Sequence, residues 1–342
     1  MELSLATGRQ ILDAAAVDAR HGTLLVLDDT GALVGVDTGS GAQTVLCRIE
    51  LPAVPVDRSR GVFPRPRVRL HAADDGSVVV VATDAGTEGL VVETATGRTT
   101  MRITAVDHHA ETVELSVAVL RHRGRQVVLH RTAWNRLDAS DALTGALLTE
   151  RAPAASDDGA RSERDLDYFH GPLAVNRSGT RVADGGWVWH PVGVLRAWSL
   201  AVWLEQDPWE PEDGPSAVDL LLRDDWNLPM VWLDEDHLAV AGLAGWDREE
   251  FEETDPRPGV RVIDVREPER SGDRLLPAPA VPERLLADGS ALVTVDVDGT
   301  SVREPVSGDL LRHWPDLRAT ALDRVRREVV AVRGDRIVTR AL

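Results

Sequence analysis

The chain contains no lysine, so all 38 basic residues among its 342 are arginine. The absence of lysine excludes Schiff-base chemistry and any other catalysis by a side-chain amine. A single cysteine, Cys47, excludes an internal disulfide, and its place in the apolar stretch TVLCRIEL predicts a buried structural thiol. Phenylalanine and tyrosine are scarce, with three and one copies against ten tryptophans.

Several sequence signals of location and catalysis are also missing. No apolar run approaches the ~18 residues that span a membrane, and the N-terminus lacks the basic stretch of a signal peptide, so we expect a cytoplasmic protein. The motifs GxSxG, HExxH, Walker loop and CxxC are absent, and we expect no cofactor and no metal. The formal net charge of −18 argues against nucleic acid or an anionic membrane as the partner.

What the chain does contain is a repeat, in which a short polar turn precedes a run of small or branched apolar residues. The clear copies are Arg20–Leu27, Asp74–Val81, Arg177–Asp184 and Ala287–Val295. The looser copies are Arg121–Leu129, Asp234–Gly242 and Arg324–Val332. Seven copies in 342 residues give a period of about 49 residues, which is the length of a four-stranded propeller blade.

A second turn follows most copies and indicates two hairpins per unit. Gly-containing turns lie in Gly35–Leu46, Val92–Ile103, Asp141–Glu150 and Glu304–Trp314, each between two alternating runs. The sequence therefore predicts one all-β domain over residues 1–342, a seven-bladed β-propeller of four-stranded antiparallel blades. The expected blades are 13–51, 66–104, 113–151, 170–206, 228–276, 281–315, and 317–342 together with 1–12.

The ends of the chain predict how the ring closes. The last unit lacks an outer strand, and Leu3–Leu12 has the pattern of a second turn, so we expect the N-terminal segment to complete the C-terminal blade. Met1–Leu5 and Arg336–Leu342 both have the pattern of a third strand. One of the two must therefore occupy another position.

Eight of the ten tryptophans fall between Trp187 and Trp246, where the repeat is interrupted. Large aromatic side chains commonly fill cores, and that is the expectation for most of these residues taken singly. A cluster on one face with a polar rim is instead typical of an interface. The candidate partner-binding residues are Trp187, Trp189, His190, Trp209, Asp225, Trp226 and Trp246.

Long acidic connections accompany the tryptophans, chiefly Gln206–Trp226 and Gly245–Gly259. Long loops on a regular scaffold often carry function. Because Trp209, Trp226 and Trp246 lie among Pro and Asp residues, we expect at least two of them to be exposed.

The histidines give weaker indications of a site. His108 and His109 are neighbours in a loop and are expected to be solvated, since adjacent side chains chelate one metal poorly. His170 and His190 lie beside aromatic residues, where each could face a pocket. A hydrogen-bonded structural role is the favoured interpretation of both.

Three stretches carry a resemblance to a known group of proteins. The segments LAVNRSGTRVADGGWVWHPVGVLRAWSLAVWL and VRVIDV resemble units of WD-repeat-like bacterial propeller proteins. Gly185–Trp198 and PWEPEDGPS (Pro208–Ser216) resemble an uncharacterised group of such propeller proteins. The resemblance implies the propeller fold and protein binding, and no reaction. Apart from Trp246-Asp247 the Trp-Asp and Gly-His dipeptides are absent, so the sequence does not predict the His-Ser/Thr-Asp hydrogen-bond network of well-formed WD repeats.

Three functions remain open from the sequence. The first is a non-enzymatic, monomeric scaffold that binds another protein or a peptide through a loop face carrying the Trp-rich, acidic segment. The second is a metal-dependent hydrolase or lactonase-like propeller with its site at the central channel. The third is a sensor that stacks a small molecule or glycan on tryptophan. The absence of catalytic motifs favours the first.

Overall fold

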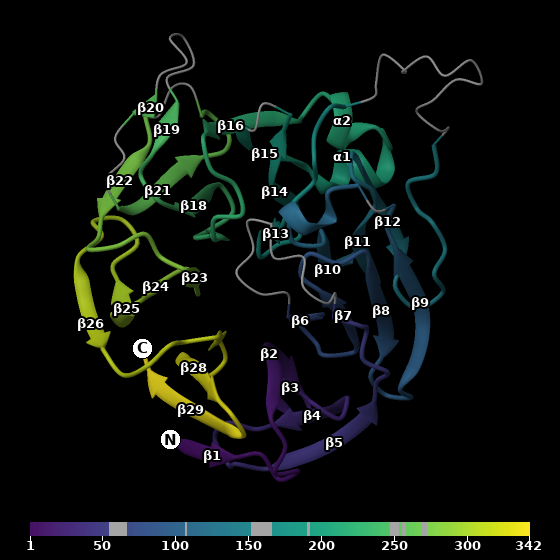
Figure 1. Cartoon of the computed structure of the whole chain (residues 1–342), viewed down its shortest axis with the longest axis vertical. Helices are drawn as coiled ribbons and strands as arrows, with labels where there is room; N and C mark the ends of the chain where they lie inside the picture. The colour runs from purple at the N-terminus through teal and green to yellow at the C-terminus, as the bar shows by residue number, and fades with distance from the viewer. Residues whose placement is uncertain are drawn as a thin grey trace.

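The structure is a computed structural model that describes residues 1–54, 67–106, 108–151, 166–189, 192–246, 253–254, 258–268 and 272–342. Seven small antiparallel sheets surround a central axis as the blades of a propeller (Figure 1). This confirms the all-β, seven-bladed fold predicted from the repeat. Among the described residues, no helix is long and apolar enough to cross a membrane.

Within each blade the strands follow one another from the innermost to the outermost. The first two blades are β2 (Ile11–Ala19), β3 (Gly22–Asp28), β4 (Ala32–Val36) and β5 (Gln43–Arg48), then β6 (Val68–Ala72), β7 (Val78–Thr83), β8 (Glu88–Glu93) and β9 (Arg98–Thr104). Blades three and four are β10 (Val117–His122), β11 (Arg125–Ala133) and β12 (Arg136–Asp141), then β13 (Leu173–Val175), β14 (Arg181–Val188), β15 (Val192–Ser199) and β16 (Val218–Arg223). Blades five and six are β17 (Met230–Trp232), β18 (His237–Ala241), β21 (Gly259–Asp264) and β22 (Arg274–Pro277), then β23 (Arg284–Ala287), β24 (Leu292–Asp296), β25 (Gly299–Arg303) and β26 (Leu310–Trp314).

The seventh blade joins the two ends of the chain, as expected. It consists of β27 (Ala321–Asp323), β28 (Glu328–Arg333), β29 (Arg336–Ala341) and, on its outer edge, β1 (Glu2–Ser4). Leu3 pairs with Ile337 in the β1–β29 register, and the two termini lie close together in Figure 1. Of the two segments with a third-strand pattern, the C-terminal one is therefore the third strand and the N-terminal one is the fourth.

Blades three to five depart from the regular pattern. In blade three an isolated bridge between Ser140 and Leu147 stands where a fourth strand would pair. In blade four the helices α1 (Leu200–Glu205) and α2 (Glu210–Asp213) separate β15 from β16. That blade therefore extends to Arg223, past the expected boundary at residue 206, because the helices delay its outer strand. In blade five a small hairpin of β19 (Gly245–Trp246) and β20 (Glu253–Thr254) is inserted.

The core lies between the blades. The central strands β3 and β7 are buried on both faces because each blade is covered by two neighbours, which explains their continuous apolar runs. The outer strand β26 is largely exposed. Cys47 lies on the outer strand β5 and is only half-buried, which corrects the expectation of a buried thiol. Partial burial raises the pKa of this thiol.

Candidate functional site

The loops of the propeller divide between two faces. Because neighbouring strands are antiparallel, the crossover into each innermost strand lies on the same face as the hairpin between the second and third strands. We call this the crossover face. The other two hairpins of each blade lie on the opposite face. The Trp-rich segment contributes to the crossover face through the β14–β15 hairpin and through the crossover that follows β16.

Aromatic side chains gather on the crossover face above blades three to five. We call this group the aromatic patch, and its members are His108, His109, Trp134, Phe169, Trp187, Trp189 and Trp226. Phe169 lies at its centre, with its ring centroid 4.0 Å from Trp187 and 4.4 Å from Trp134. The stack continues from Trp187 to Trp226 at 5.1 Å. The Trp187–Trp226 separation is typical of attractive aromatic pairs, and Phe169 packs still more closely on its two neighbours.

The patch has a buried base and an exposed top. Phe169 and Trp187 are 2% and 4% exposed, whereas Trp189 is 51% exposed. Trp189 contacts the base through Trp187 at 5.7 Å and His109 at 5.4 Å between ring centroids. A rigid aromatic platform therefore supports a large apolar surface in contact with solvent.

Glycines in β14 and β15 allow the patch to form. A Cβ atom on Gly186 would lie 2.2 Å from the carbonyl oxygen of Phe169, and one on Gly193 would lie 1.9 Å from that of Asp225. Because Gly186 has no side chain, the crossover at Phe169 approaches β14 closely enough to exchange two backbone hydrogen bonds with Trp187, at 2.7 and 3.1 Å. The glycines of Gly185-Gly186-Trp187 therefore allow a loop to pack closely on the strand β14.

The patch adjoins the mouth of the central channel. The indole Nε1 of Trp226 and the amide Nδ2 of Asn227 both donate to the carbonyl oxygen of Thr112, at 2.8 and 2.6 Å. These bonds tie the crossover of blade five to that of blade three. Asn227 and Glu114, two residues beyond Thr112, both line the channel cavity.

Carboxylates border the patch on the same crossovers. Asp167, Asp224 and Asp225 are exposed. The carboxylate of Asp225 forms an ion pair with Nε of Arg223 at 2.9 Å, but the Asp225 side chain remains 57% exposed. The border is therefore acidic and accessible to solvent.

The structure brings together only part of the set predicted from sequence. Trp187, Trp189, Asp225 and Trp226 lie at the patch. Trp209 does not, because it caps α2 and lies under the guanidinium of Arg151, 5.2 Å from the ring centroid. His190 lies outside the described residues. Trp246 belongs to β19, and its side chain is outside the description.

The expectation of two exposed tryptophans in the acidic loops is not met for the two whose side chains are described. Trp209 and Trp226 are both half-buried. The guanidinium of Arg151 covers Trp209. Trp226 stacks on Trp187 and donates a hydrogen bond to the carbonyl oxygen of Thr112. Proline and aspartate in a loop indicate exposure of the backbone, but here they do not prevent the indole rings from packing.

Sequence reasoning missed Trp134 and Phe169, and it treated His108 and His109 as a solvated pair. His108 is exposed, but its ring stacks on Phe169 at 5.7 Å. Trp134 and Phe169 lie in the β11–β12 hairpin and the following crossover, far in sequence from Trp187. One sequence signal could have grouped Trp134, Phe169, His108 and His109: all four lie in segments that the repeat places on the crossover face.

His170 is a structural residue, in agreement with the favoured interpretation. It is fully buried, and its Nδ1 lies 2.6 Å from Oδ2 of Asp184, whose Oδ1 accepts from the backbone N–H of Gly171. Burial, opposed by the charge of Asp184, lowers the pKa of His170, so the neutral imidazole predominates at neutral pH. These hydrogen bonds hold the crossover residues His170 and Gly171 against Asp184 of β14.

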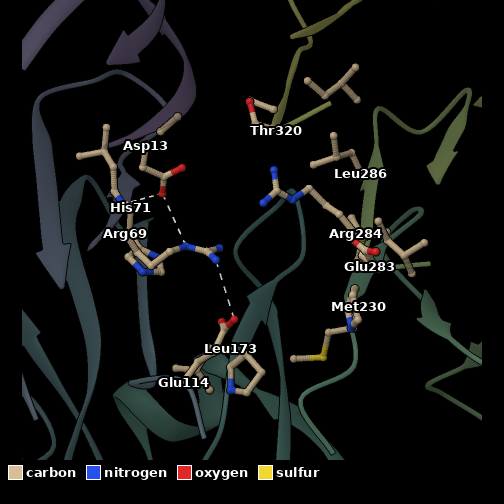
Figure 2. A pocket seen from close by; sticks show the side chains of 18 of the residues that line it. Asp13, Arg69, His71, Glu114, Leu173, Met230, Glu283, Arg284, Leu286 and Thr320 are labelled. Atoms are coloured by element: carbon tan, nitrogen blue, oxygen red, sulfur yellow. Dashed lines mark hydrogen bonds and ion pairs between the residues drawn. The ribbon is translucent and has the colours of Figure 1, made fainter. Parts of the chain in front are cut away.

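The central channel forms a cavity of about 680 Å³ lined by the innermost strands. Figure 2 shows Arg69 and Arg284 reaching into it, with Asp13 and Glu114 beside Arg69. Burial, and then the charge of Arg69, lowers the pKa of His71 to about 4, so this lining imidazole is neutral. Within the described residues, no group of three or more His, Cys, Asp or Glu side chains is placed to hold a metal ion.

No protein-family model matches the chain, and no curated protein matches it either. Solved structures do resemble it. A chain of the "Crystal Structure of Mitotic Checkpoint Complex" has a TM-score of 0.58 and 12% identity, and the match covers 100% of this chain and 91% of that one. A chain of Kuenenia stuttgartiensis hydrazine synthase has a TM-score of 0.59 and 11% identity, with coverage of 98% and 96%.

The WD40 domain of Neurospora crassa Pan2 has a TM-score of 0.54 and 10% identity, with coverage of 98% of this chain and 89% of that one. At such low identities a structural likeness shows the fold alone. The chain is therefore a seven-bladed β-propeller in fold.

Proposed function

We propose that the protein is a non-enzymatic scaffold that binds another protein or a peptide through the aromatic patch on its crossover face. The observation that carries the proposal is the exposure of Trp189 above a buried aromatic base. Interfaces concentrate their binding energy in aromatic anchors of this kind, which lose little conformational freedom on binding. A 51% exposed indole has much apolar surface left to bury.

The acidic border indicates the chemistry of the partner. Asp167, Asp224 and Asp225 are exposed on the crossovers that carry the patch, and the whole chain has a net charge of −18. A partner that inserts an apolar or aromatic side chain beside Trp189 and presents arginine or lysine to the border matches both features. The sensor hypothesis uses the same indole but gives no role to the charged border.

Selection of displayed random peptides on the immobilised protein tests the proposal. We expect enriched peptides to combine an aromatic or aliphatic residue with basic residues. Trp189→Ala is expected to weaken their binding by at least about tenfold, because truncation of a hot-spot anchor costs about 2 kcal/mol or more. Leu311→Ala removes a side chain that is 56% exposed on the outer strand β26 and serves as the matched control.

Two results would contradict the proposal. One is equal binding of the selected peptides to wild type and Trp189→Ala. The other is enrichment of no peptide, with glycans quenching the fluorescence of wild type but not of Trp189→Ala, which would favour the sensor.

A further inference from the structure

The charged groups of the channel cavity are arranged unequally on its two walls. On the first wall Arg69 lies among three carboxylates. Its Nε is 3.5 Å from Asp13, and its Nη1 is 3.7 Å from Asp84 and 3.8 Å from Glu114. Burial alone would lower the pKa of Arg69, but the three carboxylates raise it above its usual value. Arg67 adds a second cation 3.2 Å from Asp84. Both arginines of this wall are therefore paired with carboxylates of the same wall.

The opposite wall carries Arg284 at the beginning of β23. Its Nη1 donates to the carbonyl oxygen of Ala319 at 3.3 Å. Within the part of the chain that the structure describes, no carboxylate lies within ion-pair distance of this guanidinium. The neighbouring Glu283 is directed to Arg318 instead. Figure 2 shows the Arg284 side chain extending from its strand into the cavity.

An unpaired guanidinium at this position is unfavourable for the fold. Burial, followed by the charges of Arg69 and Arg67, lowers the pKa of Arg284 to about 10, so the side chain remains charged at neutral pH. Arg284 is half-buried, and a charge that loses much of its hydration is normally paired, because the loss otherwise goes uncompensated. An arginine that supported the fold would be expected to face a carboxylate, as Arg69 does.

The surroundings of Arg284 define what could pair with it. Apolar side chains continue the same cavity, among them Leu173, Met230 and Leu286. The carboxylates around Arg69 would repel an anion with several charges. A single negative charge on an apolar body fits the Arg284 guanidinium, which has no ion pair with any described residue, and the apolar walls beside it.

We propose that the central channel binds the carboxylate of an apolar monocarboxylic acid, held by the guanidinium of Arg284 with its apolar part against Leu173, Met230 and Leu286. The carboxylate can belong to a free acid or to the C-terminus of a chain that ends in an apolar residue. Both sources present the same group to Arg284. The site is distinct from the aromatic patch and does not depend on the function proposed above.

Calorimetric titration at constant ionic strength tests the site with two kinds of probe. The free acids are benzoate and hexanoate, compared with benzamide and hexanamide. The peptide is acetyl-Gly-Gly-Leu with a free or an amidated C-terminus. We expect at least one carboxylate to bind at least about tenfold more tightly than its amide, because charge-assisted hydrogen bonds to arginine are strong. Which probe binds identifies the source.

Variants then assign the binding to Arg284. Arg284→Met is expected to weaken binding of the carboxylate probe by at least about tenfold. Arg284→Lys should weaken it by less, because lysine keeps the positive charge but not the bidentate geometry. Arg102→Gln removes an equal charge from the exposed edge of β9 and should bind as wild type. Because Arg284 is unpaired, we expect Arg284→Met to melt no lower than wild type.

Three results would overturn the inference. The first is equal binding of carboxylates and amides, or no binding of any probe below about 10 mM. The second is undiminished binding to Arg284→Met. The third is a fall of more than about 5 °C in the melting temperature of Arg284→Met, which would show that the side chain supports the fold.

Discussion

Gly186 lies in β14 directly beneath the crossover that carries Tyr168 and Phe169. Its backbone N–H donates to the hydroxyl of Tyr168 at 2.9 Å, and that hydroxyl lies 3.1 and 3.0 Å from the carbonyl oxygens of Asp184 and Val194. Burial strongly raises the pKa of this phenol, so it remains a neutral donor. The position therefore combines a backbone approach with a hydrogen-bond centre at the base of the aromatic patch.

We expect Gly186→Ala to destabilise the protein by about 2 kcal/mol, because an added methyl group must displace well-packed atoms. Its Cβ would lie 2.2 Å from Phe169 O and 2.5 Å from Cζ of Tyr168. Urea denaturation measures the change, and the fluorescence of Trp187 should shift as its stack with Phe169 loosens. Gly89→Ala is the control, since its nearest contacts are at 3.4 Å. Equal stability of the two variants would contradict this explanation of the Gly-Gly-Trp sequence.

At the scale of elements, α1 and α2 replace the turn between the last two strands of blade four and fasten that blade to blade three. Arg151 Nη1 pairs with Asp138 at 2.8 Å, and its Nη2 pairs with Glu212 of α2. Trp203 of α1 is 1% exposed and packs in the cluster that also contains Leu129 and Leu137 of blade three. Much of the Trp-rich segment therefore serves the contact between blades.

Glu212 makes this contact sensitive to pH. Burial, opposed by the charge of Arg151, raises the pKa of Glu212 from 4.5 to about 7. The folded state therefore holds a proton more tightly than the unfolded state. The stabilisation that Glu212 contributes is fully present below pH 4.5 and is lost as the pH rises through about 7.

We expect the unfolding free energy of Glu212→Gln to decline less between pH 5 and pH 8 than that of wild type, because glutamine does not titrate. Denaturant titrations at a series of pH values measure the difference. Asp213→Asn, one residue further along α2 and exposed, should give a profile parallel to that of wild type. Parallel profiles for wild type and Glu212→Gln would show that Arg151 holds the carboxylate ionised throughout.

For the whole molecule, the decisive contact is the pairing of β1 with β29. Three residue pairs close the ring, and Leu5, 2% exposed, fills the core between the seventh and first blades. Without this strand β29 would present an unpaired edge, which favours association with other chains.

Deletion of residues 1–5 is therefore expected to cost more than about 3 kcal/mol, since it removes a buried leucine and a row of backbone hydrogen bonds. The measurements are urea denaturation and light scattering, and we expect the deleted protein also to aggregate. Glu2→Gln removes only the exposed ion pair with Arg336 and should leave the unfolding free energy close to that of wild type. A deleted protein that melted cooperatively at the wild-type temperature would show that the ring does not need this closure.

Local pattern was sufficient to predict the architecture. Turn residues such as Asp-Gly in Asp75-Gly76, where Gly76 has a φ of +67°, and the runs between them determine hairpins through short-range geometry. The length of the repeat then sets the blade number, and the incomplete last unit implies closure by the N-terminal strand. The sequence also located the irregular region between Trp187 and Trp246, because the repeat fails there.

Only the tertiary structure decided which side chains meet. Trp134, Phe169 and Trp187 come from two different blades and the crossover between them, and their stack depends on how the blades are rotated about the axis. Trp209 and Trp189 each precede an X-Pro pair in the sequence, yet one lies under Arg151 and the other is exposed to solvent. The unpaired state of Arg284 likewise follows from the direction in which Glu283 turns. Such contacts join residues far apart in the chain, so no local pattern encodes them.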